Sequence, residues 1–190
     1  LKPFHGNLTS FMSGKARRLM VPMLFVGTIF ALLQSLVPGS NAAVQHWYLL
    51  HIEPVAHFWY VESLLWIFLG VALLDEWGNL TKPLGFVAWF MGACVLYLTV
   101  AGPHILGIDG AIYLAPYFLL GLALSRFEPR AFITRKSVKL VLICIALFAI
   151  FRMGIPKPNP DRKTIDMLLA GLCLCVLVLH VPFKAAWWAN

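Results

Sequence analysis

The chain has 190 residues, of which 61% are hydrophobic, and it carries a formal net charge of +7 at pH 7. Charged residues make up 12% of the chain, about half the ~25% typical of globular domains, and the mean hydropathy is +0.82. So few charges cannot cover the surface of a soluble domain of this size, which excludes a cytosolic enzyme, a nucleic-acid-binding module and a disordered chain. We therefore expect a membrane protein that is surrounded by lipid and binds no nucleic acid.

Six apolar runs are long enough, or nearly long enough, to cross a bilayer core of ~30 Å, which takes ~20 helical residues. Each run predicts an α-helix, because a segment in lipid must satisfy its own backbone hydrogen bonds and none of the runs alternates as barrel strands do. The sequence therefore predicts an all-α fold, a single polytopic membrane domain over residues 1–190 with about six transmembrane helices. The predicted spans are 19–37, 55–74, 83–101, 105–125, 138–153 and 165–182.

Lysine and arginine are divided unevenly between the two sides of this predicted bundle. One side holds both ends of the chain and the segments after the second and fourth spans, and it carries 11 of the 15 basic residues. The other side carries four, all between the fifth and sixth spans. Because basic segments stay in the cytoplasm, we expect both ends of this chain to be cytoplasmic. The expected membrane is a bacterial inner (plasma) membrane.

The second predicted span holds an ionisable residue well inside its apolar run. Trp59, Glu62 and Trp66 fall at i, i+3 and i+7, on one helix face. Glu62 lies ~7.5 Å deeper than His57, which sits near the outer interface. An ionised group in hydrocarbon costs roughly 2.5–3.5 kcal/mol on insertion scales, so Glu62 needs a polar neighbour. That neighbour is either a substrate or catalytic centre, or a basic residue on an adjacent helix.

A second acidic residue lies near the outer end of the fourth predicted span, in the segment Gly107-Ile-Asp-Gly110. The flanking glycines permit a close backbone approach or a local break in the helix. Asp109 therefore has two interpretations: a contact with substrate, or a helix cap or structural hydrogen bond.

A basic cluster stands immediately before the first predicted span. Lys15 and Arg18 are three residues apart and share a helix face. Guanidinium groups pair strongly with phosphate oxygens, and an ammonium group acts as a point charge. The cluster is either a phosphate-binding site or an anchor on lipid headgroups. The four cysteines have neither disulfide nor zinc spacing, and we expect no metal site.

Three segments occur in the order and spacing of a known family. Phe11-Met-Ser-Gly-Lys-Ala-Arg-Arg-Leu-Met-Val-Pro22 resembles the "basic-x-x-Arg-Leu-x-x-Pro" segment of the acyltransferase-3 family of integral-membrane acyltransferases. His57-Phe-Trp-Tyr-Val-Glu62 resembles the "His-Leu-Trp-Phe-Leu" helix start of that family. Tyr117-Phe-Leu-Leu-Gly-Leu-Ala-Leu-Ser-Arg126 resembles its "Phe-Phe-Leu-x-Gly-x-x-x-x-Arg" helix end.

The resemblance implies transfer of an acyl group, often acetyl from acetyl-CoA, onto a hydroxyl of a carbohydrate or lipid-linked glycan. It implies that Lys15 and Arg18 hold the CoA phosphates, although the first of these positions is commonly Arg in the family. It also implies an acceptor site at the start of the tryptophan helix, with Trp59 and then Glu62 as its residues. We add His57 and Asp109 to this substrate-binding set, and Glu62 is expected to orient the catalytic base or bind the acceptor.

Two features of the family have no counterpart in this chain. The presumed catalytic His of the family lies in a membrane helix ahead of the basic motif, and the family core has about ten helices. We therefore expect this chain to be an internal fragment of a longer acyltransferase that lacks the first helices and is inactive alone.

Two other classes compete with this interpretation. The segment Gly107-Ile-Asp-Gly110 resembles the rhomboid "Gly-x-Ser-Gly" helix start, with Asp109 in place of the nucleophilic Ser. A six-helix rhomboid-like pseudoprotease that binds transmembrane clients is therefore one alternative. The other is a piece of a transporter or scaffold, in which Glu62 and Asp109 line an ion path.

Overall fold

The computed structural model describes residues 4, 6–37, 47, 52, 58–103, 105–127, 136–153 and 163–179. All the regular structure in these residues is helical, which confirms the all-α class. In chain order the helices are α1 (Leu8–Leu36), α2 (Trp59–Glu76), α3 (Pro83–Thr99), α4 (Ile108–Phe127), α6 (Lys136–Met153) and α7 (Ile165–Leu179).

The first helix begins well before the predicted span. It starts at Leu8, whereas the apolar run predicted a start at residue 19. Asn7 is the reason, because its side chain accepts a hydrogen bond from the backbone N–H of Ser10 at 3.2 Å and so caps the helix. The basic cluster therefore lies within α1 rather than ahead of it. The third helix begins at Pro83 as predicted, since proline at a first helical position loses no hydrogen bond.

Two of the described helices, α1 and α4, are long and apolar enough to cross a membrane. Helix α3 and residues 165–178 are apolar but shorter. Helix α2 contains three carboxylates, and α6 contains three basic residues, which lowers the apolar character of both. The structure thus supports a membrane protein with two candidate spans, and the six-span bundle stays a prediction.

The chain divides into two compact units, Lys2–Pro116 and Tyr117–Asn190, and the boundary falls within α4. Pro116 lies at this boundary. Proline has no backbone N–H, so the helix lacks one of its internal hydrogen bonds there.

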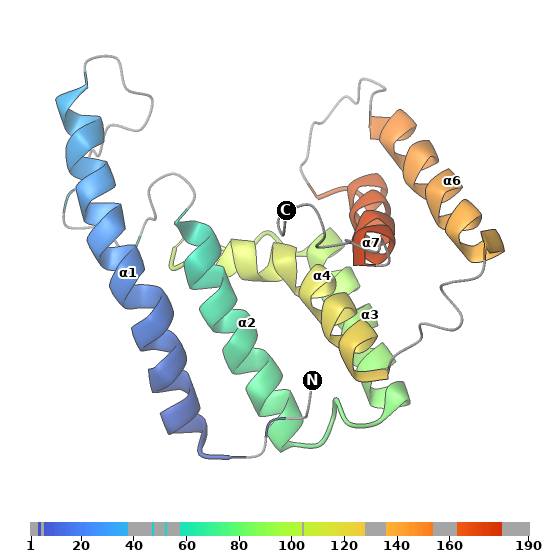
Figure 1. Cartoon of the computed structure of the whole chain (residues 1–190), viewed down its shortest axis with the longest axis horizontal. Coiled ribbons are helices and arrows are strands. Elements are labelled where there is room, and N and C mark those ends of the chain that lie inside the picture. The colour runs from blue at the N-terminus through green and yellow to red at the C-terminus, as the bar shows by residue number, and fades with distance from the viewer. Residues whose placement is uncertain are drawn as a thin grey trace, which may run out of the picture. The chain divides into compact units, whose positions relative to one another are not determined.

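In the unit Lys2–Pro116, α1 and α2 pack side by side and run antiparallel (Figure 1). Phe4 contacts Asp75 at one end of the pair, Lys15 contacts Phe68 near the middle, and Phe30 contacts Phe58 at the other end. The buried residues of α1 follow at intervals of four and form its α2-facing stripe; they are Met23, Gly27 and Ala31.

In the unit Tyr117–Asn190, α6 packs against α7. The buried side chains of these two helices are mostly small or aliphatic; they are Ala146, Ala149, Leu168, Ala170, Cys173 and Val176. Thr164 precedes α7, and its hydroxyl accepts a hydrogen bond from the backbone N–H of Met167 at 3.4 Å. Small residues allow the two backbones to approach closely, which is how helices associate in lipid.

Candidate functional site

One face of α2 is tied to the loop that leads into α4. The Ser63 hydroxyl is fully buried and lies 2.7 Å from the carbonyl oxygen of Trp59 and 2.7 Å from that of Gly107. A hydroxyl has one proton, so Ser63 shares it between these two carbonyls. The indole N–H of Trp66 donates to the carbonyl oxygen of Leu106 at 2.9 Å. We call this contact the α2–α4 junction; it comprises Trp59, Glu62, Ser63 and Trp66 with residues 102–103 and 105–110.

Two glycines make the close approach at the junction possible. Gly107 has a φ of 65°, and a Cβ there would lie 2.7 Å from the carbonyl oxygen of Trp59. A Cβ on Gly110 would collide with the Ser63 hydroxyl and with the indole ring of Trp59. Leu106 also adopts a positive φ, of 52°, which is strained for a residue with a side chain. Of the two possibilities that the glycines left open, the structure shows the close backbone approach.

Glu62 is buried within the junction. Its side chain is 2% exposed, and neither carboxylate oxygen has a hydrogen-bond partner among the described residues. A Cβ on Gly107 would lie 2.8 Å from the Cβ of Glu62, so the stem of this side chain packs against the loop. A buried carboxyl group without a partner destabilises the fold. Its two oxygens are available to accept hydrogen bonds from the hydroxyls of a ligand.

Asp109 lies in the first turn of α4 and holds the start of the loop. Its Oδ1 accepts a hydrogen bond from the backbone N–H of Gly102 at 3.0 Å, and its own N–H donates to the carbonyl oxygen of Pro103 at 3.3 Å. This geometry provides the structural hydrogen bond that was one of the two sequence interpretations. A contact between Asp109 and a substrate stays a prediction.

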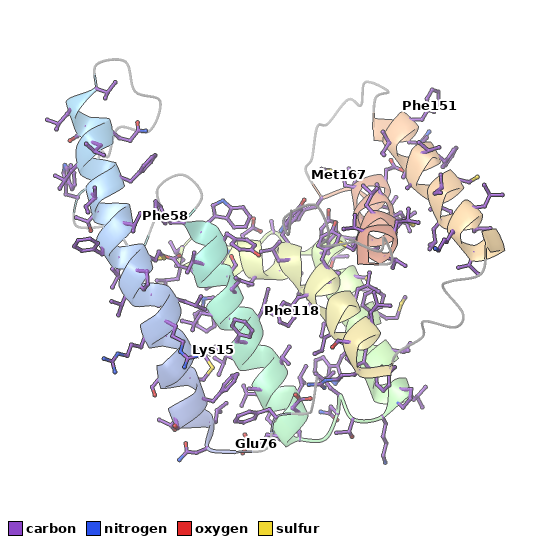
Figure 2. The ribbon with its side chains drawn as sticks, in the orientation of Figure 1. Lys15, Phe58, Glu76, Phe118, Phe151 and Met167 are labelled. Carbon is purple, nitrogen blue, oxygen red and sulfur yellow. The ribbon has the colours of Figure 1, made fainter. Side chains whose placement is uncertain are left out.

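The basic residues of α1 have different surroundings. The Lys15 ammonium lies 4.3 Å from the ring centroid of Phe68 on α2 and 5.5 Å from that of Phe11, and it points toward α2 (Figure 2). This geometry is a cation–π interaction. Arg17 and Arg18 are exposed. A spacing of three residues rotates Arg18 by ~60° around the helix axis from Lys15. Lys15 therefore contacts α2, whereas Arg18 is exposed.

The basic residues and the junction lie at different levels of the same helix pair. Lys15 contacts Phe68, which is nine residues along α2 from Trp59. This distance is roughly 13 Å at a rise of 1.5 Å per residue. The structure therefore brings Trp59, Glu62 and Asp109 to one junction and leaves Lys15 and Arg18 away from it. His57 lies outside the described residues.

Two buried polar residues of α2, Ser63 and Asp75, are not among the residues predicted from the sequence. Ser63 is not ionisable, so its position in an apolar run does not single it out, although it follows Trp59 by four residues on the same helix face. Asp75 is 1% exposed, and its Oδ2 accepts a hydrogen bond from the backbone N–H of Phe4 at 3.0 Å. Asp75 lies just beyond the predicted span, where an acidic residue is ordinary and does not indicate a buried site. Among the described residues, no group of three His, Cys, Asp or Glu side chains could hold a metal ion.

This geometry defines a class: a membrane-associated helical protein with a buried carboxyl group at a tight helix junction. The acyltransferase-domain family matches the chain over residues 4–189. The chain therefore belongs to this family, the acyltransferase-3 family, as the three motifs predicted. No curated protein and no solved structure matches the chain. The family supports a membrane acyltransferase in general and does not favour the rhomboid-like or transporter alternatives.

Proposed function

We propose that the protein transfers an acyl group from acyl-CoA, with acetyl-CoA as the expected donor, to a hydroxyl of a carbohydrate or lipid-linked glycan. The family match over residues 4–189 is the observation that carries this proposal.

The proposed reaction exchanges one acyl bond for another. The acceptor oxygen attacks the thioester carbonyl, the new C–O ester bond forms, and the C–S bond breaks. The acceptor proton passes to a general base, which the family resemblance identifies as a His in a helix ahead of the basic segment. CoA leaves as its thiol after taking up a proton. The carbonyl oxygen carries negative charge during the attack and needs hydrogen-bond donors.

The proposed donor site is the basic part of α1. Arg18 is exposed, so its guanidinium is accessible to the phosphates of CoA. Lys15 is half-buried and its charge lies over the Phe68 ring, so it adds a positive field more than a directed contact. We therefore assign the larger part of phosphate binding to Arg18.

The proposed acceptor site is the α2–α4 junction. The oxygens of Glu62 are acceptors without partners in the described structure, and the hydroxyls of a sugar are donors that match them. Trp59 lies one helical turn before Glu62 and offers an aromatic face to a sugar ring. His57 is a further member of the proposed set, in which Glu62 either binds the acceptor or orients the base, and Asp109 belongs to the set through the loop that it holds.

The proposed location is the inner (plasma) membrane of a bacterium, with both ends of this chain in the cytoplasm. The excess of Lys and Arg on that side of the predicted bundle supports this orientation. In this orientation the donor site opens toward the cytoplasmic supply of acyl-CoA.

Transfer by the intact membrane protein in vesicles tests the proposal. The donor is acetyl-CoA labelled in its acetyl group, and the acceptors are a panel of oligosaccharides and lipid-linked glycans. The expected result is labelled acceptor from which mild alkali releases acetate, as it does from an ester. Label that stays in acetyl-CoA with every acceptor, although the purified protein is folded, would overturn the proposal.

A further inference from the structure

We infer that Asp109 is a positioning residue, which holds Gly102 and Pro103 against the start of α4 so that the carbonyl groups of Leu106 and Gly107 hold the face of α2 that carries Trp59 and Glu62. This inference rests on the proposed function of the junction as the acceptor site. It gives Asp109 a role different from the substrate contact that the sequence predicted.

Asp109 joins the start of the loop to its end through two hydrogen bonds. Its Oδ1 accepts from the Gly102 N–H at 3.0 Å, and its backbone N–H donates to Pro103 at 3.3 Å. The approach is tight, since a Cβ on Gly102 would lie 2.8 Å from the Cα of Asp109. The side chain and the backbone of one residue therefore fasten the start of the loop to the first turn of α4.

The closed loop presents two carbonyl groups to α2. Leu106 and Gly107 both have positive φ, and this conformation directs their carbonyl oxygens to Trp66 and Ser63. Left-handed backbone persists only where the surrounding structure holds it, especially at a non-glycine residue such as Leu106. The Asp109 hydrogen bond to Gly102 is one such restraint on the loop.

The same carbonyls fix the surroundings of the proposed acceptor residues. Ser63 shares its proton between the carbonyl oxygens of Gly107 and Trp59, so its hydroxyl links the loop to the first turn of α2. Glu62 precedes Ser63 and packs against Gly107. Opening of the loop would therefore break the hydrogen bond between Ser63 and Gly107 and remove the packing of Gly107 against the side chain of Glu62.

Two substitutions of Asp109 separate positioning from a charged contact with substrate. Asp109→Asn removes the charge and keeps an oxygen that accepts from the Gly102 N–H. Asp109→Ala removes both. A positioning role predicts that the Asn variant resembles the wild type and the Ala variant does not. A charge that binds substrate predicts that both variants fail alike.

The first measurement needs no activity. Hydrogen–deuterium exchange of the intact protein in lipid nanodiscs follows peptides covering residues 101–108 and 59–66. We expect Asp109→Ala to raise the exchange rate in both peptides by about tenfold, since a hydrogen bond that closes the loop is lost. Asp109→Asn should stay within about twofold of the wild type. Equal exchange in Asp109→Ala and wild type would overturn the inference, and so would an Asn variant that exchanges like the Ala variant.

The second measurement compares the KM for the acceptor with the KM for acyl-CoA in acetyl transfer. Asp109→Ala is expected to raise the acceptor KM about tenfold and leave the acyl-CoA KM unchanged, while Asp109→Asn keeps both. An Asn variant as impaired as the Ala variant would show that the charge contacts the substrate. If the wild type transfers no acetyl group, the proposed function fails, and the exchange measurement still decides the role of Asp109.

Ser63→Ala tests the same connection from the α2 side without altering Asp109. It removes the hydroxyl that Gly107 binds, so exchange in residues 101–108 should rise about tenfold. The matched control is Gly70→Ala in α2, where an added Cβ meets no atom within 4 Å. It should exchange like the wild type. Unchanged exchange in Ser63→Ala would overturn the proposed connection between the loop and α2.

Discussion

Different kinds of contact hold the helices together inside each of the two compact units. In Lys2–Pro116, polar side chains and glycines bring backbones together: the buried Ser63 donates to the carbonyl oxygen of Gly107, and the half-buried Asp109 accepts from the N–H of Gly102. In Tyr117–Asn190, α6 and α7 pack mainly through small and aliphatic side chains. Both arrangements allow helices to approach closely, but only the first also buries a carboxyl group without a partner in the described structure.

The difference indicates where the chemistry lies. Apolar contacts between α6 and α7 are sufficient for helix packing in lipid and need no further explanation. A buried Glu62 and a strained Leu106 reduce stability, so they are expected where a function requires them. The predictions below test whether the junction differs from the α6–α7 contact in the way this comparison implies.

Gly110→Ala should have the largest effect on stability. The new Cβ collides with the Ser63 hydroxyl and the Trp59 ring, and relieving the collision costs up to about 3 kcal/mol. Thermal unfolding in detergent measures the loss. Gly70→Ala has open space around its Cβ and should instead stabilise by about 0.5–1 kcal/mol. Gly171→Ala in α7, which meets the end of the Tyr117 ring, should lie between the two.

Arg18→Gln should weaken donor binding by about 10- to 150-fold, since charge-assisted hydrogen bonds contribute about 1.5–3 kcal/mol. The measurement is the acyl-CoA KM at saturating acceptor. Arg152→Gln is the matched control, because Arg152 is also exposed but lies in α6 of the other unit. Equal KM values for the two variants would remove Arg18 from the proposed donor site.

Glu62→Leu should raise stability by about 1–2 kcal/mol, because it replaces a buried carboxyl group that has no described partner with an apolar side chain. Denaturant unfolding in mixed micelles measures the change. Leu169→Ala in α7 removes an exposed apolar side chain from the other unit and should change stability little. A destabilised Glu62→Leu variant would mean that Glu62 has a structural partner.

The smallest expected effect is the coupling between Lys15 and Phe68. A half-exposed cation–π pair contributes about 0.5–1 kcal/mol. A double-mutant cycle with Lys15→Met and Phe68→Leu measures the coupling as the departure from additivity. Additive losses would show that Lys15 does not hold α1 against α2. The reason for assigning Lys15 a smaller part than Arg18 in donor binding would then be lost.

The sequence predicted the helices well where an apolar run coincided with a strong boundary residue, as at Pro83 of α3 and at Thr164 just before α7. It failed at the start of α1, where the Asn7 cap extends the helix through polar residues. The two-glycine segment predicted a close approach but not its target, because contact with Ser63 depends on the packing of distant segments. The separation of Lys15 from Arg18 likewise depends on which side of α1 faces α2.

Acetyl transfer by Glu62→Gln is the most direct test of the account. Gln keeps the size of Glu62 and removes its charge, and the intact membrane protein is assayed with acetyl-CoA and its carbohydrate acceptor. We predict that kcat/KM for the acceptor falls at least ~100-fold, whereas Gly121→Ala in the other unit, where the added Cβ meets no atom within 4 Å, keeps its rate. Full transfer by a folded Glu62→Gln variant would contradict the claim that the α2–α4 junction is the acceptor site.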